Sequence, residues 1–412
     1  MKTGMEELQA RGFIQQCSNI EGLKELLSSE TVTFYCGFDP TGPSLHAGHL
    51  IPLFAMAHLN RAGHRAIALV GGGTALIGDP SGKTEMRKMQ TKEQIGSNAE
   101  RMKQQIEKFI DFESGSAILL DNREWLSTLN YIDFLRDIGK HFSVNRMLSF
   151  ETYKMRLETG LSFIEFNYQL LQSFDFLTLY QREGCKLQIG GDDQWGNIVA
   201  GADLTRRIES VEVFGLTFPL VTRSDGKKMG KTEKGALYLD PTATSPYDFF
   251  QYWRNVADPD VDKFLKLYTF LPLEEIHRLS SYAGQEINVA KEALAFELTA
   301  IVHGREEAEK AREAARAAFS STAAGGDTSS IPSITINRSE LKAGIQILDL
   351  FSRTTLCASR SEARRLVSQG GASINEQKVS DIELNVDDSW IADGKIMLRA
   401  GKKRYFQIFI RD

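Results

Sequence analysis

The sequence predicts an α/β protein: a doubly wound, Rossmann-like parallel sheet, then an α-helical domain and a small C-terminal α+β module. Three observations support this prediction. Strand-like and helix-like segments alternate through roughly the first 220 residues, and the pattern becomes helical after Asp240. A run of small and polar residues, "SSTAAGGDTSSIPS" at 320–333, is typical of a flexible linker.

The expected strands are apolar, β-branched or aromatic runs. They lie at 31–38 ("TVTFYCGF"), 65–73, 116–122 and 185–191. The spacing of apolar residues over 46–63 predicts a helix after the first of them. In a doubly wound sheet, ligands bind beyond the C-terminal ends of the strands. The Gly-rich and polar clusters of this sequence fall at those ends.

The pattern divides the chain into five segments. They are a sheet domain at 1–222 with an insertion at about 122–150, a mobile loop at 223–235, a helical domain at 236–319, a linker at 320–337 and a module at 338–412. The insertion includes an amphipathic stretch from Asn130 to Leu148.

Composition indicates a globular protein of the cytoplasm. Of 412 residues, 42% are hydrophobic and 25% charged, and no apolar run approaches the ~20 residues that span a bilayer. The N-terminus lacks the apolar core of a signal peptide. Four widely spaced cysteines predict neither a zinc site nor a disulfide framework. Net charge is −5, yet residues 338–412 carry 13 Lys and Arg against ten Asp and Glu, which suggests a polyanionic partner.

Two nucleotide motifs are excluded by spacing. "GDPSGKT" at 78–84 resembles a P-loop, but Ile77 stands where that motif needs Gly. "GGGTALIG" at 71–78 resembles a dinucleotide fingerprint, but Leu76 occupies the third Gly position. The glycines at 71–73 then mark either a tight turn or a close approach to a ligand.

Two of only seven histidines, His46 and His49, lie three residues apart where a helix begins. A helix N-terminus attracts phosphate, and histidines there add donors. Gly48 would let a flat ligand approach the backbone, and Pro52 fits the first turn. The alternative is a pair of surface histidines on an amphipathic helix.

A polar stripe lies on an otherwise apolar helix at 163–180. Tyr168, Gln172 and Asp175 are spaced i, i+4 and i+7, so they share one face. The turn after the strand at 185–191 adds Gln188, Asp192, Asp193 and Gln194. Buried polar groups need partners, so this stripe predicts either a structural network or a pocket for a small ligand with an amine and a hydroxyl.

Two loops combine glycines with cations. The first carries Lys227, Lys228 and Lys231, and the second carries Asp79, Lys83 and Arg87. Mobile cationic loops suit a triphosphate, although a charged hairpin tip is the simpler interpretation of the first one.

Together these stretches resemble the bacterial-type tyrosyl-tRNA synthetases. "HAGH" at 46–49 resembles the HIGH signature of class I synthetases, and "KMGKT" at 228–232 resembles KMSKS. "YCGFDPT", "LIGDPSGK", "YQLLQSFDF" and "LQIGGDDQWGNI" are similar to tyrosine-specific blocks, in the family's order. "LFSRTTLCASRSEARRLVSQGGASINEQKV" at 350–379 is similar to the small RNA-binding module that ends bacterial members.

The resemblance implies that L-tyrosine is activated by ATP to tyrosyl-adenylate and then transferred to tRNA(Tyr). It implies tyrosine contacts from Tyr35, Asp79, Tyr168, Gln172, Asp175 and Gln194. It implies ATP contacts from Cys36, Gly37, Asp39, His46, Gly48, His49, Gly191, Asp193 and Lys231. The catalytic groups would be Thr41, His46, His49, Lys83, Arg87, Lys228 and Lys231, and RNA contacts would come from Ser359, Arg360, Arg364 and Arg365.

The resemblance also assigns roles to the segments: dimer contacts to 122–150, the signature loop to 223–235, the anticodon region to 236–319 and RNA binding to 338–412. A homodimer is implied, as is Mg²⁺ accompanying ATP without a protein-bound metal. A solvated basic helix is the alternative for the module's arginines. Three other classes of protein are the alternatives: a tryptophanyl-tRNA synthetase, an inactive RNA-binding or splicing protein of this fold, and a small-molecule nucleotidyltransferase.

Four residues depart from the family's usual pattern. Ala47 stands where Ile is commoner, Gly230 and Thr232 differ from KMSKS, and Asp192 stands where Ser is common. Asp192 would add negative charge near the adenylate, so its effect on ATP affinity is left open.

Overall fold

The computed structural model describes residues 3–81, 90–226, 229–232, 235–319, 331–392, 394–401 and 404–411. The chain forms two compact units. The first comprises Met1–Thr232, Ala236–Ala243 and Val256–Leu294, and the second comprises Glu233–Gly235, Thr244–Asn255 and Ala295–Asp412. The predicted boundaries at 222, 235 and 319 stay predictions.

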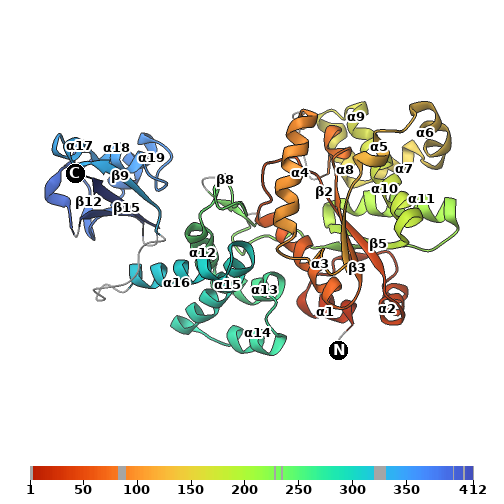
Figure 1. The fold of residues 1–412 in the computed structure, drawn as a ribbon, viewed down its shortest axis with the longest axis horizontal. Coiled ribbons are helices and arrows are strands. Elements are labelled where there is room, and N and C mark those ends of the chain that lie inside the picture. Colours follow the sequence, from red (N-terminus) through yellow and green to blue (C-terminus); the bar gives the residue numbers. More distant parts are fainter. Residues whose placement is uncertain are drawn as a thin grey trace. The chain divides into compact units, whose positions relative to one another are not determined.

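A six-stranded sheet is the centre of the first unit (Figure 1). Its strands are β1 (Gln16–Cys17), β2 (Thr33–Phe38), β3 (Arg65–Val70), β4 (Ala117–Asp121), β5 (Cys185–Gly191) and β6 (Phe214–Phe218). They lie in the order β1-β6-β5-β2-β3-β4, and all neighbours are parallel except β1 and β6. The predicted strands are therefore confirmed, with a two-residue antiparallel strand added at one edge.

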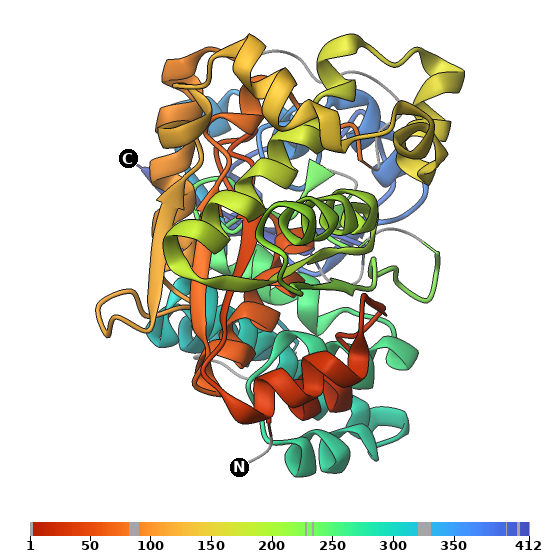
Figure 2. The same ribbon diagram turned by 90° about the vertical axis from the view of Figure 1, so that its right-hand side faces the viewer.

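Helices cover both faces of this sheet, as predicted for a doubly wound fold. They are α1 (Gly4–Arg11), α2 (Ile20–Ser29), α3 (Leu50–Arg61), α4 (Lys92–Ile106), α5 (Arg123–Leu126), α6 (Tyr131–Asp137), α7 (Val144–Ser149), α8 (Glu151–Thr159), α9 (Phe163–Phe166), α10 (Tyr168–Glu183) and α11 (Trp195–Glu209). α3 lies on one face, and α10 and α11 lie together on the other (Figures 1 and 2). Every β3 residue after Arg65 is buried, which explains its unbroken apolar sequence.

Five further helices follow the sheet domain. They are α12 (Pro246–Arg254), α13 (Val261–Tyr268), α14 (Leu273–Ser280), α15 (Ile287–His303) and α16 (Arg305–Phe319), and the short strands β7 (Lys231–Thr232) and β8 (Gly235–Ala236) precede them. α12 packs on α16, and the Phe249 ring meets His303 edge to face at 4.9 Å. The helical pattern predicted after Asp240 is confirmed.

The C-terminal module is α+β, as predicted. Its elements are β9 (Ser333–Asn337), α17 (Arg338–Lys342), β10 (Ile345–Gln346), α18 (Ile347–Ser352), α19 (Arg360–Ser368), β11 (Ala372–Ile374), β12 (Gln377–Val379), β13 (Asn385–Val386), β14 (Lys395–Ala400) and β15 (Arg404–Arg411). The main sheet has the order β12-β11-β14-β15-β9.

Strand β9 corrects the predicted linker of 320–337. Ser333–Asn337 pairs in parallel with β15, and Ile336 is buried in the core of the module while Ile334 packs against it. The alternation of Ile with polar residues in "SITIN" is the signal of a half-buried strand. The module therefore begins before residue 338.

The predicted dimer segment at 122–150 folds as α5, α6 and α7. Its apolar residues Tyr131, Ile132, Leu135 and Val144 are exposed on this single chain. Among the described residues, no helix is both long and apolar enough to cross a membrane.

Candidate active site

The predicted site residues gather at the carboxyl ends of β2 and β5. The chain runs from β2 outward through β3 to β4, and from β5 outward through β6, so the strand order reverses between β2 and β5. Such a reversal leaves a crevice where doubly wound proteins bind ligands. The turn after β2 carries His46 and His49, and the turn after β5 is the 3-10 helix η4 (Asp192–Gln194).

The two histidines cap a turn rather than lying on a helix surface. A 3-10 turn, η1 (Ala47–His49), precedes α3. The Nδ1 of His46 accepts the Gly48 N–H at 3.1 Å, and the Nδ1 of His49 accepts the His46 N–H at 3.1 Å. A neutral ring that accepts at Nδ1 carries its hydrogen on Nε2. Each histidine can thus donate from Nε2, and the role predicted for the pair stays a prediction.

Gly48 lies against the ring of His46. A Cβ at this position would lie 2.9 Å from Cε1 of His46 and 3.0 Å from its Nδ1. The glycine therefore makes room for the capping ring, and the predicted approach of a flat ligand stays a prediction.

Three amide side chains hold the backbone of the turn that carries Thr41. Gln90 donates to the Thr41 carbonyl at 2.9 Å and Asn98 donates to the Pro40 carbonyl at 3.0 Å. The Oε1 of Gln105 accepts the Leu45 N–H at 2.8 Å. Asn98 and Gln105 belong to α4, so this helix fixes the turn that precedes the histidines.

Asp175 is buried and lies at the centre of a hydrogen-bond network. It accepts Nε1–H of Trp125 at 2.7 Å and Nδ2–H of Asn122 at 2.9 Å. Burial raises the pKa of its carboxyl to about 8, against the lowering effect of these two donors; the charges of Asp39 and Asp121 add to the rise.

Tyr35 is buried beside Asp175. Its ring meets Phe176 edge to face at 5.3 Å, and its hydroxyl has no hydrogen-bond partner among the described residues. Burial raises its pKa well above the usual value, and the charge of Asp175 raises it further, because the two groups are close. The Oε1 atoms of Gln172 and Gln188 are also buried, and neither has a partner in the part of the chain that the structure describes. Three unsatisfied polar atoms in one region of the crevice are what a polar ligand would satisfy.

A chain of hydrogen bonds connects this pocket to the nucleotide side. Asn122 also donates to Oγ1 of Thr74 at 3.0 Å, and Thr74 donates to Oδ1 of Asp39 at 2.8 Å. The Tyr168 hydroxyl donates to Oδ2 of Asp39 at 2.8 Å. Tyr168, which was predicted to hold the tyrosine ammonium, is therefore engaged with a residue predicted to hold the adenylate.

A second network joins Asp79 to Gln194. Nε2 of Gln194 donates to Asp79 at 2.7 Å, and Oε1 of Gln194 accepts from Asn197 at 3.2 Å. The Ser81 N–H donates to the other oxygen of Asp79 at 2.9 Å. Asp79 was predicted to bind the ammonium group of the substrate and Gln194 to lie near its carboxylate. The two side chains thus touch each other across the crevice.

The glycines at 71–73 follow β3 and lead through a turn into the 3-10 helix η2 (Thr74–Leu76), which confirms the turn that the sequence offered as one alternative. A Cβ on Gly71 would lie 1.9 Å from Oδ1 of Asp39, and one on Gly72 would lie 2.3 Å from Oδ1 of Asp121. Gly71 and Gly72 therefore make room for these two carboxylates, and a close approach to a ligand stays a prediction.

The remaining predicted nucleotide contacts lie around the same crevice. Gly37 is exposed at the end of β2 with open space beside it. Cys36 is buried, and burial raises the pKa of its thiol to about 12. A Cβ on Gly191 would lie 2.6 Å from Oδ1 of Asp193, so the two are adjacent.

Asp192 is hydrogen-bonded to side chains of the neighbouring strands β1 and β6. Its Oδ1 accepts Nε2–H of Gln16 at 2.7 Å and the Thr217 hydroxyl at 2.9 Å. This departure from the family pattern therefore anchors η4 to the edge of the sheet formed by β1 and β6.

The signature loop is described in part. Ala47 donates its N–H to the Leu237 carbonyl at 2.8 Å, and Leu237 donates to the Gly230 carbonyl at 2.8 Å. Lys231 begins β7, directly after Gly230. Lys83, Arg87, Lys227 and Lys228 lie outside the described residues.

In the C-terminal module, two of the predicted RNA contacts have partners within the protein. Ser359 caps α19 by accepting the Glu362 N–H at 3.3 Å, and Nε of Arg360 pairs with Asp349 at 3.1 Å. Arg364 and Arg365 are exposed on α19.

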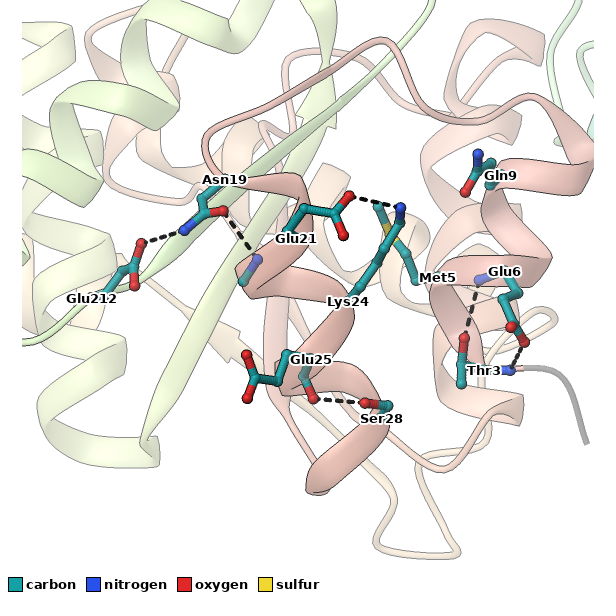
Figure 3. A pocket seen from close by; sticks show the side chains of 11 residues that line it. Thr3, Met5, Glu6, Gln9, Asn19, Glu21, Lys24, Glu25, Ser28 and Glu212 are labelled. Atoms are coloured by element: carbon teal, nitrogen blue, oxygen red, sulfur yellow. Dashed lines mark hydrogen bonds and ion pairs between the residues drawn. The ribbon is translucent and has the colours of Figure 1, made fainter.

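A separate cavity of about 920 Å³ lies between α1 and α2 (Figure 3). Its walls carry Glu6, Glu21, Glu25 and Glu212 with Lys24. Several of these groups are already satisfied: Lys24 pairs with Glu21 at 3.0 Å, and Asn19 donates to Glu212 at 3.0 Å. This cavity shares no residue with the predicted site.

Sequence reasoning missed several residues that organise the site. Thr74, Asn122, Trp125 and Asn197 had no assigned role, although their positions after β3, after β4 and on α11 follow from the sheet topology. Gln188 was noticed beside the turn but received no function. Each is a polar side chain at the carboxyl edge of the sheet, and that position was the available signal.

Comparison with known proteins defines the class first. Residues 27–320 match the model of the class I tRNA synthetases (W and Y), and residues 326–408 match the model of the tyrosine--tRNA ligase SYY-like C-terminal domain. A class I synthetase fold with a C-terminal domain of this type is thereby shown.

Relatives narrow the class. The chain is 57% identical over 409 residues to a tyrosine--tRNA ligase of Treponema denticola and 54% identical over 408 residues to one of Acetivibrio thermocellus, with 99% of each chain covered in both cases. A C-terminally truncated mitochondrial tyrosyl-tRNA synthetase of Aspergillus nidulans superposes with a TM-score of 0.70 at 30% identity, covering 77% of this chain and 95% of the other. The chain belongs to the tyrosine--tRNA ligase family. The predicted family, fold class and enzyme class are confirmed.

Proposed function

We propose that this chain activates L-tyrosine with ATP in the crevice between β2 and β5, and then transfers the tyrosyl group to the 3′ end of tRNA(Tyr). The observation that carries the proposal is the set of unpartnered buried atoms beside Asp175: the Tyr35 hydroxyl and Oε1 of Gln172 and Gln188. A phenol and an ammonium group supply the donors and the acceptor that these atoms lack.

The phenol end would be held by Tyr35 and Asp175. The substrate hydroxyl donates to the Asp175 carboxylate and accepts from the Tyr35 hydroxyl, so both buried groups become satisfied. Phenylalanine would leave them unpaired in an apolar wall, which is how a site built for a hydroxyl rejects the analogue without one, and tyrosyl-tRNA synthetases are themselves the standard example of that effect.

The ammonium end would be held by Asp79 and Gln172, with Tyr168 beside them. Gln194, hydrogen-bonded to Asp79, would lie near the substrate carboxylate. That carboxylate is ionised at neutral pH, so it needs no base to attack the α-phosphorus of ATP. A new C–O–P link forms, the bond from the α-phosphorus to the bridging oxygen breaks, and pyrophosphate leaves with its charge.

Catalysis then rests on positioning and charge stabilisation. His46 and His49 would donate from Nε2 to the phosphates, and Thr41 would add a hydroxyl. Lys83, Arg87, Lys228 and Lys231 would neutralise the leaving pyrophosphate, and Mg²⁺ would arrive as part of the ATP substrate. Cys36, Gly37, Asp39, Gly48, Gly191 and Asp193 would line the adenylate.

The tRNA would be bound partly by the C-terminal module. Arg364 and Arg365 are exposed on α19 and suit phosphate contacts, whereas Ser359 and Arg360 would have to exchange their internal partners. A homodimer would cover the exposed Tyr131, Ile132, Leu135 and Val144 of the 122–150 segment. We place the enzyme in the cytoplasm.

ATP–pyrophosphate exchange with single amino acids tests the proposal. Exchange should require L-tyrosine. Exchange driven equally by L-tryptophan, or absent with every amino acid, would contradict it. Removing residues 331–412 should preserve exchange and weaken tRNA charging at least about tenfold through lost phosphate contacts; equal loss of both activities would contradict the role of the module.

A further inference from the structure

Two residues that depart from the family signatures touch each other. Gly230 belongs to the signature loop at 223–235, called the lysine loop below. Its φ is +77°, and a Cβ built on it would lie 2.7 Å from Cβ of Ala47. The Ala47 backbone is next, with its Cα and the Gly48 nitrogen both at 3.5 Å. Ala47 is the first residue of η1, which together with His46 is called the histidine turn below. The two signature segments therefore meet at this contact.

The backbone holds the same two residues together from the other side. Leu237 accepts the Ala47 N–H at 2.8 Å and donates its own N–H to the Gly230 carbonyl at 2.8 Å. Leu239 donates to the Leu45 carbonyl at 2.9 Å, and His46 and Tyr238 form an antiparallel bridge. Residues 237–239 thus extend beside the histidine turn and tie the loop to it.

We propose that the Ala47–Gly230 contact positions the lysine loop against the histidine turn for the activation step. Lys231 follows Gly230 directly, so any shift of Gly230 moves the start of β7 and its lysine relative to His46 and His49. The small side chain of Ala47 and the absence of a side chain at Gly230 would then both be needed for the two backbones to approach this closely. This inference rests on the proposed function, because the step it serves is adenylate formation.

The glycine is needed for two separable reasons. Its positive φ is strained for any other residue, and its missing Cβ prevents a collision with Ala47. Gly226 separates them: it lies in the same loop with the same φ of +77°, but a Cβ there would meet nothing within 4 Å. Gly226→Ala is therefore a matched control that imposes the strain without the collision.

The test compares Gly230→Ala, Gly226→Ala and the double variant Ala47→Gly/Gly230→Ala in tyrosine-dependent pyrophosphate exchange. Gly230→Ala should lower kcat roughly 10- to 100-fold, the size expected when a catalytic group is misplaced by about 1 Å. The Kd for tyrosine should not change, since the loop does not line that pocket. Gly226→Ala should lose less than about threefold. The double variant should regain at least about tenfold over Gly230→Ala, because only contacts of 3.5 Å remain.

Equal losses in Gly230→Ala and Gly226→Ala, or no recovery in the double variant, would overturn the proposal. Amide hydrogen exchange provides a readout that does not depend on activity. The Ala47 and Leu237 amides should exchange faster in Gly230→Ala than in the wild type and in Gly226→Ala; unchanged protection would also overturn it. Failure of the wild type to exchange pyrophosphate with tyrosine would instead overturn the proposed function.

Discussion

The proposed tyrosine pocket and the proposed phosphate side of the same crevice are built in different ways. Around the pocket, side chains on α10 and after β4 form a buried network in which Asp175 already has two donors. On the phosphate side, a turn is fixed by backbone contacts and by the amides of Gln90, Asn98 and Gln105. If the proposed roles hold, the groups that select the substrate are in place before it binds, whereas charge stabilisation depends on the positions of the loops.

Removing the Asp175 carboxylate should have the largest effect on the pocket. Asp175→Ala leaves Asn122 and Trp125 without their acceptor and the substrate phenol without its own. Loss of a hydrogen bond to a charged group together with orphaned buried donors should lower kcat/KM for tyrosine by at least ~100-fold. Circular dichroism should show an unchanged fold. Full exchange activity in a folded variant would remove Asp175 from the pocket.

Removing one supporting donor should have a smaller effect. Trp125→Phe keeps the ring but takes away the hydrogen bond of 2.7 Å to Asp175. The Kd for tyrosine should rise about tenfold, in line with one hydrogen bond to a carboxylate. Trp390→Phe, the same change in the C-terminal module, should leave this Kd unchanged in calorimetry. Similar behaviour of both variants would show that Trp125 does not support the pocket.

Proton linkage at Asp175 should produce a pH dependence confined to the pocket. Because the pKa of its carboxyl is raised to about 8, the empty pocket is protonated below that pH, and a phenol that donates to the carboxylate must displace the proton. Tyrosine binding should weaken about fivefold from pH 8 to pH 7. Because the pKa of Asp175 is higher in the folded protein than in the unfolded chain, protonation of this carboxyl stabilises the fold. The contribution is full at a pH below the ordinary pKa of a carboxyl group, and it is lost as the pH rises through about 8. Asp175→Asn should abolish the slope, and a slope that persists would assign the proton to another group.

The smallest effect is expected on the outer side of η4. Asp192→Ser removes the acceptor of Gln16 and Thr217, which should lower the free energy of unfolding by ~1 kcal/mol and change exchange by less than about twofold. Gln16→Ala should lower the stability by a similar amount, measured by thermal unfolding. A large change in the KM for ATP would show that Asp192 acts on the nucleotide after all.

Much of the fold was predictable because β-branched runs and amphipathic spacing are local signals. β5 was predicted residue for residue, and His46 and His49 were placed at a helix start. The partners of Asp175 could not be predicted, since Asn122 and Trp125 lie about fifty residues away and meet it only through the strand order. Strand β9 falls in the predicted linker because its polar residues obscure one buried isoleucine, Ile336, and one partly buried isoleucine, Ile334.

The sequence also could not predict which segments lie close enough to require a glycine. The glycines at 71–73 were expected to form a turn or to face a ligand, yet two of them face the Asp39 and Asp121 carboxylates. Nothing in the signature "KMGKT" indicated that Gly230 lies against Ala47. Such contacts depend on which backbone segments meet, and that is fixed only by the assembled sheet and its loops.

Discrimination between tyrosine and phenylalanine tests the central claim most directly. The measurement is the ratio of kcat/KM for the two amino acids in pyrophosphate exchange, for the wild type and for Asp175→Ala. If the buried Asp175 and Tyr35 select the phenol, the wild type should favour tyrosine strongly and the variant should lose most of that preference by failing with tyrosine. A variant that keeps the wild-type ratio would contradict the account.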